Sequence, residues 1–221
     1  MDRRANLEIV YTYLLHALAG FLNALTIMAF GKMTGVMTGN MSSMIILGFA
    51  GEKHAALVLL FYVFCYFLGS MIVGFLSQFH ISHQVRDLDF FGFHLLFAAL
   101  FTLFWFLTDS IVLSISVVAV RLGMQNAFPL PSRHKRIRTT SMTGLLTEIG
   151  ILMGGLLRGS HLVNIRSLTF NILYLLTFFL GTSISALIHY KTHFSVLLVG
   201  IVLELLAAAF CYRLSSIEQD E

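Results

Sequence analysis

The sequence predicts an all-α integral membrane protein, and its composition, its charge and the length of its apolar runs all indicate this class. Of the 221 residues, 57% are hydrophobic and 11% are charged, less than half the charged fraction of an average soluble domain. The mean hydropathy is +0.85, and several runs are long enough to cross about 30 Å of hydrocarbon as helices. Soluble, secreted, disordered and coiled-coil proteins are therefore excluded.

Six long apolar segments are expected to cross the membrane: 9–30, 54–79, 91–108, 109–128, 168–190 and 192–213. Two shorter segments, 34–51 and 139–158, are rich in Gly, Ser, Thr and Met, and they are expected to be broken or re-entrant helices. The first segment is too long for a signal-peptide core and lacks a small-residue cleavage site, so we expect it to remain as an anchor. The whole chain, 1–221, is interpreted as one membrane domain.

Basic residues predict the orientation of these segments, because loops on the cytoplasmic side carry an excess of Lys and Arg. The largest basic cluster lies at 129–138, and Arg3 and Arg4 begin the chain. Both regions fall on one side only if 34–51 enters and leaves the membrane on the same side, and the same behaviour of 139–158 places Arg158, Arg166 and Arg213 on that side too. We therefore expect a cytoplasmic N-terminus. The net charge of +3 is explained by topology, so no nucleic-acid partner is expected.

Two motifs recur in the same order and at nearly the same separation. GFLNA at 20–24 is echoed by GMQNA at 123–127, and MTG at 37–39 by MTG at 142–144. Each half of the chain therefore contains a long helix, a short polar helix and two long helices. Because three crossings is an odd number, the second half is predicted to be inverted relative to the first, as in many transporters. The halves are 9–108 and 109–213.

These motifs resemble the YoaK family of uncharacterised multi-pass bacterial inner-membrane proteins. The resemblance is carried by GFLNA with MTGN at 37–40, and by GMQNA followed by RTTSMTGLLTEIG at 138–150, and it spans nearly the whole chain. It implies a bacterial inner (plasma) membrane and the transport of a small molecule, without naming a substrate. This chain carries Asn23 where the family often has Asp, which puts a coupling acid at that position in doubt.

Hydroxyl side chains of the two short segments are the first candidates for a solute pathway. Thr34, Thr38 and Ser42 share one helix face, as do Thr140, Thr143 and Thr147. Since irregular backbone within a membrane must be enclosed by protein or water, we expect the two segments to meet inside the bundle. The alternative is that the hydroxyls bond to their own helix or hold helices together.

Glu148 and Arg121 are the candidates for a coupling site. An acid near mid-membrane costs about 2.5 to 3.5 kcal/mol, so Glu148 is expected to relay protons or contact substrate, with Arg121 as its partner. A purely structural ion pair is the alternative. Glu204, in the last crossing, has no evident partner in the sequence and is assigned either to the pathway or to a subunit contact.

Amide side chains complete the predicted site. Gln125 lies on the same helix face as Arg121, next to Asn126, and Asn23 holds the place of Asn126 in the first half. Each amide both donates and accepts hydrogen bonds, which suits a neutral polar ligand, although these residues would also serve to lock the two halves together.

The sequence offers no support for an enzyme or a cofactor. It contains no H-E-x-x-H, G-x-S-x-G or Walker loop. His80-x-x-His83 lacks a third ligand, so no metal is expected. Cys65 and Cys211 lie in apolar segments and are interpreted as small hydrophobes.

The resulting hypothesis is a secondary transporter, or permease, of a small polar solute, for which proton coupling is considered. The alternatives are a passive channel for small solutes and a non-transporting membrane assembly or regulatory protein. The Gly150-x-x-x-Gly154 and Gly181/Ser185 pairs are expected to pack helices internally, with homodimerisation as the second option. The predicted substrate-binding residues are Asn23, Thr38, Gly39, Asn40, Gln125, Asn126, Thr143 and Gly144, and the predicted coupling residues are Glu148 and Arg121.

Overall fold

The computed structural model describes residues 3–30, 37–76, 83–107, 110–127, 142–159, 164–192 and 195–217, and these residues form helices and short turns with no strand. The helices are α1 (Arg3–Phe30), α2 (Met37–Phe49), α3 (Lys53–Leu76), α4 (His83–Leu107), α5 (Ile111–Ala127), α6 (Met142–Leu157), α7 (Ile165–Lys191) and α8 (Val196–Ile217). Each of the eight predicted segments overlaps one of these helices. The predicted basic loop at 129–138, Thr34, Thr140, His80 and the His83 side chain lie outside the described part.

Four of these helices are long and apolar enough to cross a membrane: Arg4–Met28, Lys53–Leu76, Ile165–Lys191 and Val196–Ile217. Their outer faces expose large apolar side chains, and Phe67 and Phe75 are 58% and 66% exposed. In water such a surface would be unfavourable, whereas lipid chains cover it without cost. The prediction of an all-α, membrane-embedded protein is therefore confirmed.

Both short helices end at a glycine in the left-handed region. Gly51, with φ +86°, turns the chain from α2 into α3, and Gly159, with φ +73°, follows α6. Residues with a Cβ rarely adopt this conformation, so glycine ends a helix there at the least cost. The long helix α7 begins at Asn164, whose side chain accepts hydrogen bonds from the backbone N–H groups of Arg166 and Ser167.

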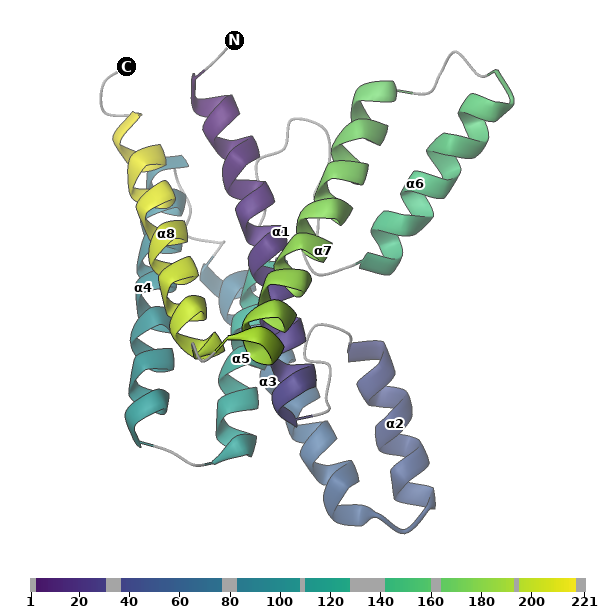
Figure 1. Ribbon diagram of the computed structural model, residues 1–221, viewed down its shortest axis with the longest axis vertical. Coiled ribbons are helices and arrows are strands. Elements are labelled where there is room, and N and C mark those ends of the chain that lie inside the picture. Colours follow the sequence, from purple (N-terminus) through teal and green to yellow (C-terminus); the bar gives the residue numbers. More distant parts are fainter. Residues whose placement is uncertain are drawn as a thin grey trace.

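The long helices pack in three principal pairs, α4 with α8, α1 with α7, and α3 with α5. The short helices lie outside these pairs, α2 against α3 and α6 against α7. In Figure 1, α2 lies in the lower half of the molecule and α6 in the upper half, and both chain termini lie at the upper end.

The expectation that the two short segments meet inside the bundle is wrong for the residues described. They pack on different long helices, and most of their side chains are exposed. The physical reason is that α2 and α6 are regular helices, so their backbone groups bond within the helix and need no enclosing protein.

Two glycine-mediated crossings bring long helices into backbone contact. A Cβ on Gly20 of α1 would overlap the carbonyl oxygen of Phe178 on α7, and a Cβ on Gly181 of α7 would overlap that of Ala17. The α3–α5 pair repeats this geometry, with Gly123 against Tyr66 and Gly69 against Val120. The repeated glycines Gly20 and Gly123 therefore both allow close backbone contact between the helices of their pair. This is the close approach that small residues allow between membrane helices.

A hydroxyl group bridges each crossing at the same place. Thr182 of α7 donates to the carbonyl oxygen of Gly20 at 3.3 Å, and Ser70 of α3 donates to that of Gly123 at 3.0 Å. The expected close packing at Gly181 is confirmed, whereas a Cβ on Gly150 or Gly154 of α6 would meet only open space within the described structure.

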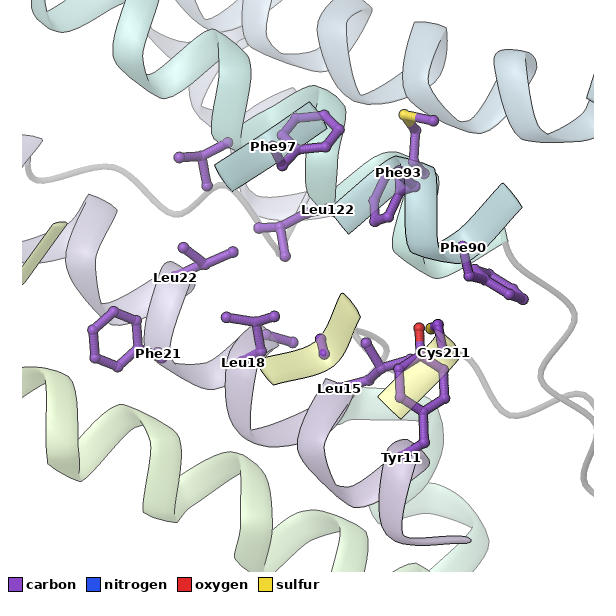
Figure 2. Close-up of a cluster of buried hydrophobic side chains, with 14 of the residues drawn as sticks. Tyr11, Leu15, Leu18, Phe21, Leu22, Phe90, Phe93, Phe97, Leu122 and Cys211 are labelled. Atoms are coloured by element: carbon purple, nitrogen blue, oxygen red, sulfur yellow. The ribbon is translucent and has the colours of Figure 1, made fainter. Parts of the chain in front are cut away.

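The largest apolar cluster lies where α1, α4, α5 and α8 meet. Figure 2 shows side chains of α1 facing the aromatic rings of α4, with Cys211 of α8 at one edge. Its labelled members are Tyr11, Leu15, Leu18, Phe21, Leu22, Phe90, Phe93, Phe97, Leu122 and Cys211. This cluster surrounds the charged residues considered next.

Candidate functional site

A fully buried ion pair joins α5 to α8. Arg121 Nε donates to Glu204 Oε1 at 2.5 Å, and Arg121 Nη2 donates to Glu204 Oε2 at 3.3 Å. Both side chains are 0% exposed. Removing either partner of such a pair typically costs about 3 to 5 kcal/mol, because the other charge is left in an apolar interior.

Two further residues extend this pair into a hydrogen-bonded chain. His94 Nδ1 on α4 lies 2.6 Å from Glu204 Oε2, and His94 Nε2 lies 2.8 Å from the hydroxyl oxygen of Tyr11 on α1. Since a carboxylate oxygen only accepts, Nδ1 carries the proton, and Nε2 of the neutral ring accepts from the tyrosine hydroxyl. The chain of Tyr11, His94, Glu204 and Arg121 thus ties four helices together.

Aromatic rings enclose the chain of four polar residues. The Arg121 guanidinium carbon lies 5.4 Å from the centroid of the Phe93 ring, and the rings of Tyr11 and Phe90 pack edge to face at 6.3 Å. In the described structure, Arg121 Nη1 has no hydrogen-bond partner. The guanidinium group therefore keeps the N–H groups of Nη1 available while its charge is balanced by Glu204.

A second charged cluster lies at the end of α1 where the chain begins. Arg4 Nη2 pairs with Asp87 Oδ2 of α4 at 2.5 Å, and Arg4 Nε pairs with Glu8 at 3.3 Å. Arg4 Nη1 also donates to the carbonyl oxygen of Leu214 on α8. Both clusters join α1, α4 and α8, and Tyr11 lies two turns along α1 from Arg4. Ionisable side chains therefore extend from one end of the molecule into its core.

Arg121 does not pair with Glu148, contrary to the sequence prediction. Its partner is Glu204, because the Arg121 side chain reaches the buried carboxylate on α8, whereas α6 packs against α7. Glu148 is half-buried on α6 and makes contacts of its own. Arg121 does have an acidic partner inside the bundle, as predicted, but that partner is Glu204 and not Glu148.

Two of the predicted amide residues on α5 make interhelical hydrogen bonds, one to α1 and one to α3. Gln125 Nε2 donates to the carbonyl oxygen of Leu15 on α1 at 2.8 Å, and Asn126 Nδ2 donates to the Tyr66 hydroxyl on α3 at 2.7 Å. Asn23 is half-buried on α1. These contacts agree with the alternative that the amides hold the halves together, and a role in solute binding stays a prediction.

The predicted residues of the short helices lie apart from this chain. Thr38, Gly39, Thr143 and Gly144 are exposed, and Asn40 is buried on α2. The Ser42 and Thr147 hydroxyls donate to carbonyl oxygens one turn earlier in their own helices. Their assignment to a solute site stays a prediction.

Sequence reasoning missed Tyr11 and His94, and it left Glu204 without a partner. The available signal was an acid in an otherwise apolar helix, which required a cation somewhere in the core. Neither the spacing nor the repeat indicated which helix would supply it. The residues described contain no group of three His, Cys, Asp or Glu side chains suited to hold a metal ion.

Comparison with known proteins identifies a family. The model of a family described as "Protein of unknown function (DUF1275)" matches residues 11–210. No curated protein and no solved structure matches the chain.

Proposed function

From the premise that the chain belongs to the DUF1275 family of proteins of unknown function, we propose that it is a secondary transporter which moves a small polar solute against its gradient by coupling to protons. Membership agrees with the resemblance to the uncharacterised YoaK family. The buried chain of Tyr11, His94, Glu204 and Arg121 is the observation that carries the proposal.

The arrangement of the helices supports a bundle of six crossings built from two inverted halves. The pairs α1–α7, α2–α3 and α1–α8 have counterparts in α5–α3, α6–α7 and α5–α4, as exchange of the two halves requires. In Figure 1, α2 runs from mid-height to the lower end and α6 from mid-height to the upper end. Inverted halves of this kind place substrate and coupling sites between them, near the middle of the membrane.

Charges at the helix ends support a cytoplasmic N-terminus. In Figure 1 the start of α1, the end of α6, the start of α7 and the end of α8 lie towards the upper end of the molecule. Arginines stand at or near these helix ends in the sequence: Arg4, Arg158, Arg166 and Arg213. The start of α3 lies at the lower end, and this helix begins with Lys53. An excess of arginine marks the cytoplasmic side, and for a bacterial protein this is the inner membrane.

The chemistry of the buried chain suits proton coupling. A proton that reaches His94 Nε2 replaces the Tyr11 O–H···N bond by an N–H···O bond and places the Glu204 carboxylate between two cations. The Glu204 carboxylate then interacts with two cations, His94 and Arg121, so its ion pair with Arg121 weakens. Because these residues come from α1, α4, α5 and α8, the protonation state of His94 biases how those helices pack. Ionisable groups retained inside a membrane typically serve such relays.

Uptake of protons into liposomes tests this function. Purified protein is reconstituted with a trapped pH-sensitive dye, and a panel of amino acids, sugars, polyols, amides and nucleobases is added outside. A transporter acidifies the interior when its solute enters, whereas a passive channel passes solute without moving protons. Solute flux that runs downhill only would contradict proton coupling.

Three variants locate the coupling site. His94→Gln keeps a side chain that donates and accepts, and we expect it to abolish proton movement while solute exchange remains. Arg121→Gln/Glu204→Gln removes both charges together, so that no buried charge is left unpaired. Glu148→Gln tests the acid predicted from sequence. If Glu148→Gln alone abolishes proton movement, coupling lies on α6 and the buried chain is structural.

A further inference from the structure

The two glycine crossings differ in the side chains beside them. Next to each crossing a buried tyrosine lies under a short helix: Tyr62 of α3 under α2, and Tyr174 of α7 under α6. Leu59 and Ile115 pack with Tyr62, together with Met44 and Leu47 of α2. The α3–α5 crossing thus fills this space with apolar groups.

Polar residues occupy two of the equivalent positions at the α1–α7 crossing. Asn171 precedes Tyr174 by three residues, as Leu59 precedes Tyr62. His16 precedes Gly20 by four residues, as Ala119 precedes Gly123. All four are buried, and His16 and Ala119 are both 0% exposed. Since the fold packs this space with Leu and Ala in one half, it has no structural need for Asn and His in the other.

Both polar side chains have an atom without a hydrogen-bond partner among the described residues. His16 Nδ1 lies 2.8 Å from the carbonyl oxygen of Thr12, and because that oxygen only accepts, Nδ1 carries the proton. His16 Nε2 is therefore an acceptor, and it has no donor. Asn171 Nδ2 is a donor that has no acceptor. Buried polar atoms are normally paired, and the described residues supply no partner for these two, so each atom is available to a bound molecule.

The two open positions lie in one interface. The His16 ring stacks on the Tyr174 ring at 4.6 Å between centroids, with 10° between the planes. Asn171 is one turn before Tyr174 on the same buried face of α7. Leu145 and Ile149 of α6 also pack in the cluster that contains Tyr174. The interface of α1, α6 and α7 therefore presents an acceptor and a donor beside an aromatic stack.

We propose that His16 and Asn171 bind the transported solute, and that this solute is a small neutral molecule carrying a hydrogen-bond donor for His16 Nε2 and an acceptor for Asn171 Nδ2. A carboxamide or a polyol has this chemistry. The described structure gives neither His16 nor Tyr174 a contact with a charged side chain, so a charged solute would lack a counter-ion there. The assignment rests on the proposed transport function, which supplies the reason for a solute to enter the bundle.

Binding to the full-length protein in detergent tests the assignment, with saturation-transfer NMR as the readout. Acetamide, urea and glycerol are the neutral probes, and acetate is the charged counterpart of acetamide with nearly the same shape. We expect neutral probes to bind and acetate to fail. If no neutral probe binds, or if acetate binds as well as acetamide, the neutral-solute class is overturned.

The equivalent crossing supplies the variants. His16→Ala and Asn171→Leu introduce the residues found at Ala119 and Leu59, and each should weaken probe binding at least about tenfold. Ser185→Val is the matched control. It removes another buried hydroxyl without a partner on α7, eleven residues and about 16 Å beyond Tyr174, and it introduces the residue found at the equivalent Val73. We expect it to leave binding unchanged.

Melting temperatures of the same variants separate binding from folding. Asn171→Leu removes an unpaired polar atom at nearly the same volume and should leave the melting temperature equal or higher, so an Asn171→Leu variant that melts well below the wild type would show a structural role and overturn the proposal. His16→Ala also removes a ring that stacks on Tyr174, so its probe binding is measured below its own melting temperature. Probe binding without proton-linked flux would overturn the transport function and leave the site intact. Proton-linked flux that survives in both His16→Ala and Asn171→Leu would overturn the assigned site and leave the transport function intact.

Discussion

The α1–α7 and α3–α5 crossings share a framework and differ in polarity. In both, two glycines bring the backbones together and a hydroxyl donates to a glycine carbonyl oxygen. Beside one crossing lie Leu59 and Ala119, and beside the other lie Asn171 and His16. The glycines and the hydroxyl bridge occur in both halves, so we assign them to the architecture. The buried Asn171 and His16 occur in one half only, so the architecture does not explain them.

Arg121 adds a second difference between the halves. It precedes Gly123 by two residues, as Leu18 precedes Gly20, and both side chains are 0% exposed. The first half fills this place with an apolar group, whereas the second half uses a cation that must be balanced by Glu204. The ion pair is therefore also an addition to the framework.

The largest expected effect comes from breaking this ion pair. Glu204→Gln leaves the Arg121 charge unpaired in the core and should destabilise the fold by about 3 to 5 kcal/mol. Arg121→Leu/Glu204→Leu makes the second half resemble the first at this position, and it should recover most of that loss. Unfolding in detergent and SDS, followed by circular dichroism, measures both variants. A double variant as unstable as the single one would show that the pair is part of the framework.

Substitution of the crossing glycines should have the next largest effect, and a similar one in both halves. Gly20→Ala and Gly123→Ala each place a Cβ against a backbone carbonyl oxygen, where no side-chain rotation relieves the overlap. We expect a loss of about 1 to 3 kcal/mol or more at each site. Gly150→Ala on α6, where the Cβ meets open space, is the control and should be neutral or stabilising. Unequal losses at Gly20 and Gly123 would break the equivalence of the crossings.

Exchange of polar and apolar residues between the crossings should give effects of opposite sign. Leu59→Asn buries an amide among apolar groups and should cost about 1 to 3 kcal/mol. Asn171→Leu removes such a group and should be neutral or stabilising. Thermal unfolding of the two variants, with no added solute, provides the measurement. If Asn171→Leu costs as much as Leu59→Asn, the amide is held by the fold and the difference between the halves is structural.

The smallest expected effect concerns the hydroxyl bridges. Thr182→Val and Ser70→Ala each remove one interhelical hydrogen bond to a glycine carbonyl oxygen. Such bonds contribute about 0.6 kcal/mol on average between membrane helices. The same unfolding measurement should give small and similar losses. A loss several times larger at one site alone would mean that its hydroxyl makes a stabilising contact in addition to the hydrogen bond at the crossing.

Local features of the sequence predicted the elements well. The six long apolar segments and the two short polar ones each overlap a helix, and the repeated Gly20 and Gly123 occupy matching places in the structure. These predictions succeeded because the transfer of a helix into lipid depends mainly on the residues of that helix. The predicted location of the short helices was wrong because their burial depends on which other helices pack against them.

The residues of the buried chain mark the limit of this approach. Arg121 and Glu204 were each recognisable as charges in apolar segments, but their pairing depends on the rotation of α5 and α8 about their own axes. His94 and Tyr11 carried no signal at all, because a polar aromatic residue within a membrane helix serves equally well at an interface or in a core.

The sequence by itself determined that this is a helical membrane protein, where its helices lie, and which glycines recur in the two halves, because hydropathy and repetition are properties of the chain. The tertiary structure alone decided that Glu204 balances Arg121, and that His16 and Asn171 stand where the other half has Ala119 and Leu59. The physical reason is that hydrogen bonds and ion pairs depend on contacts over a few ångströms between helices far apart in sequence, which helix packing alone sets.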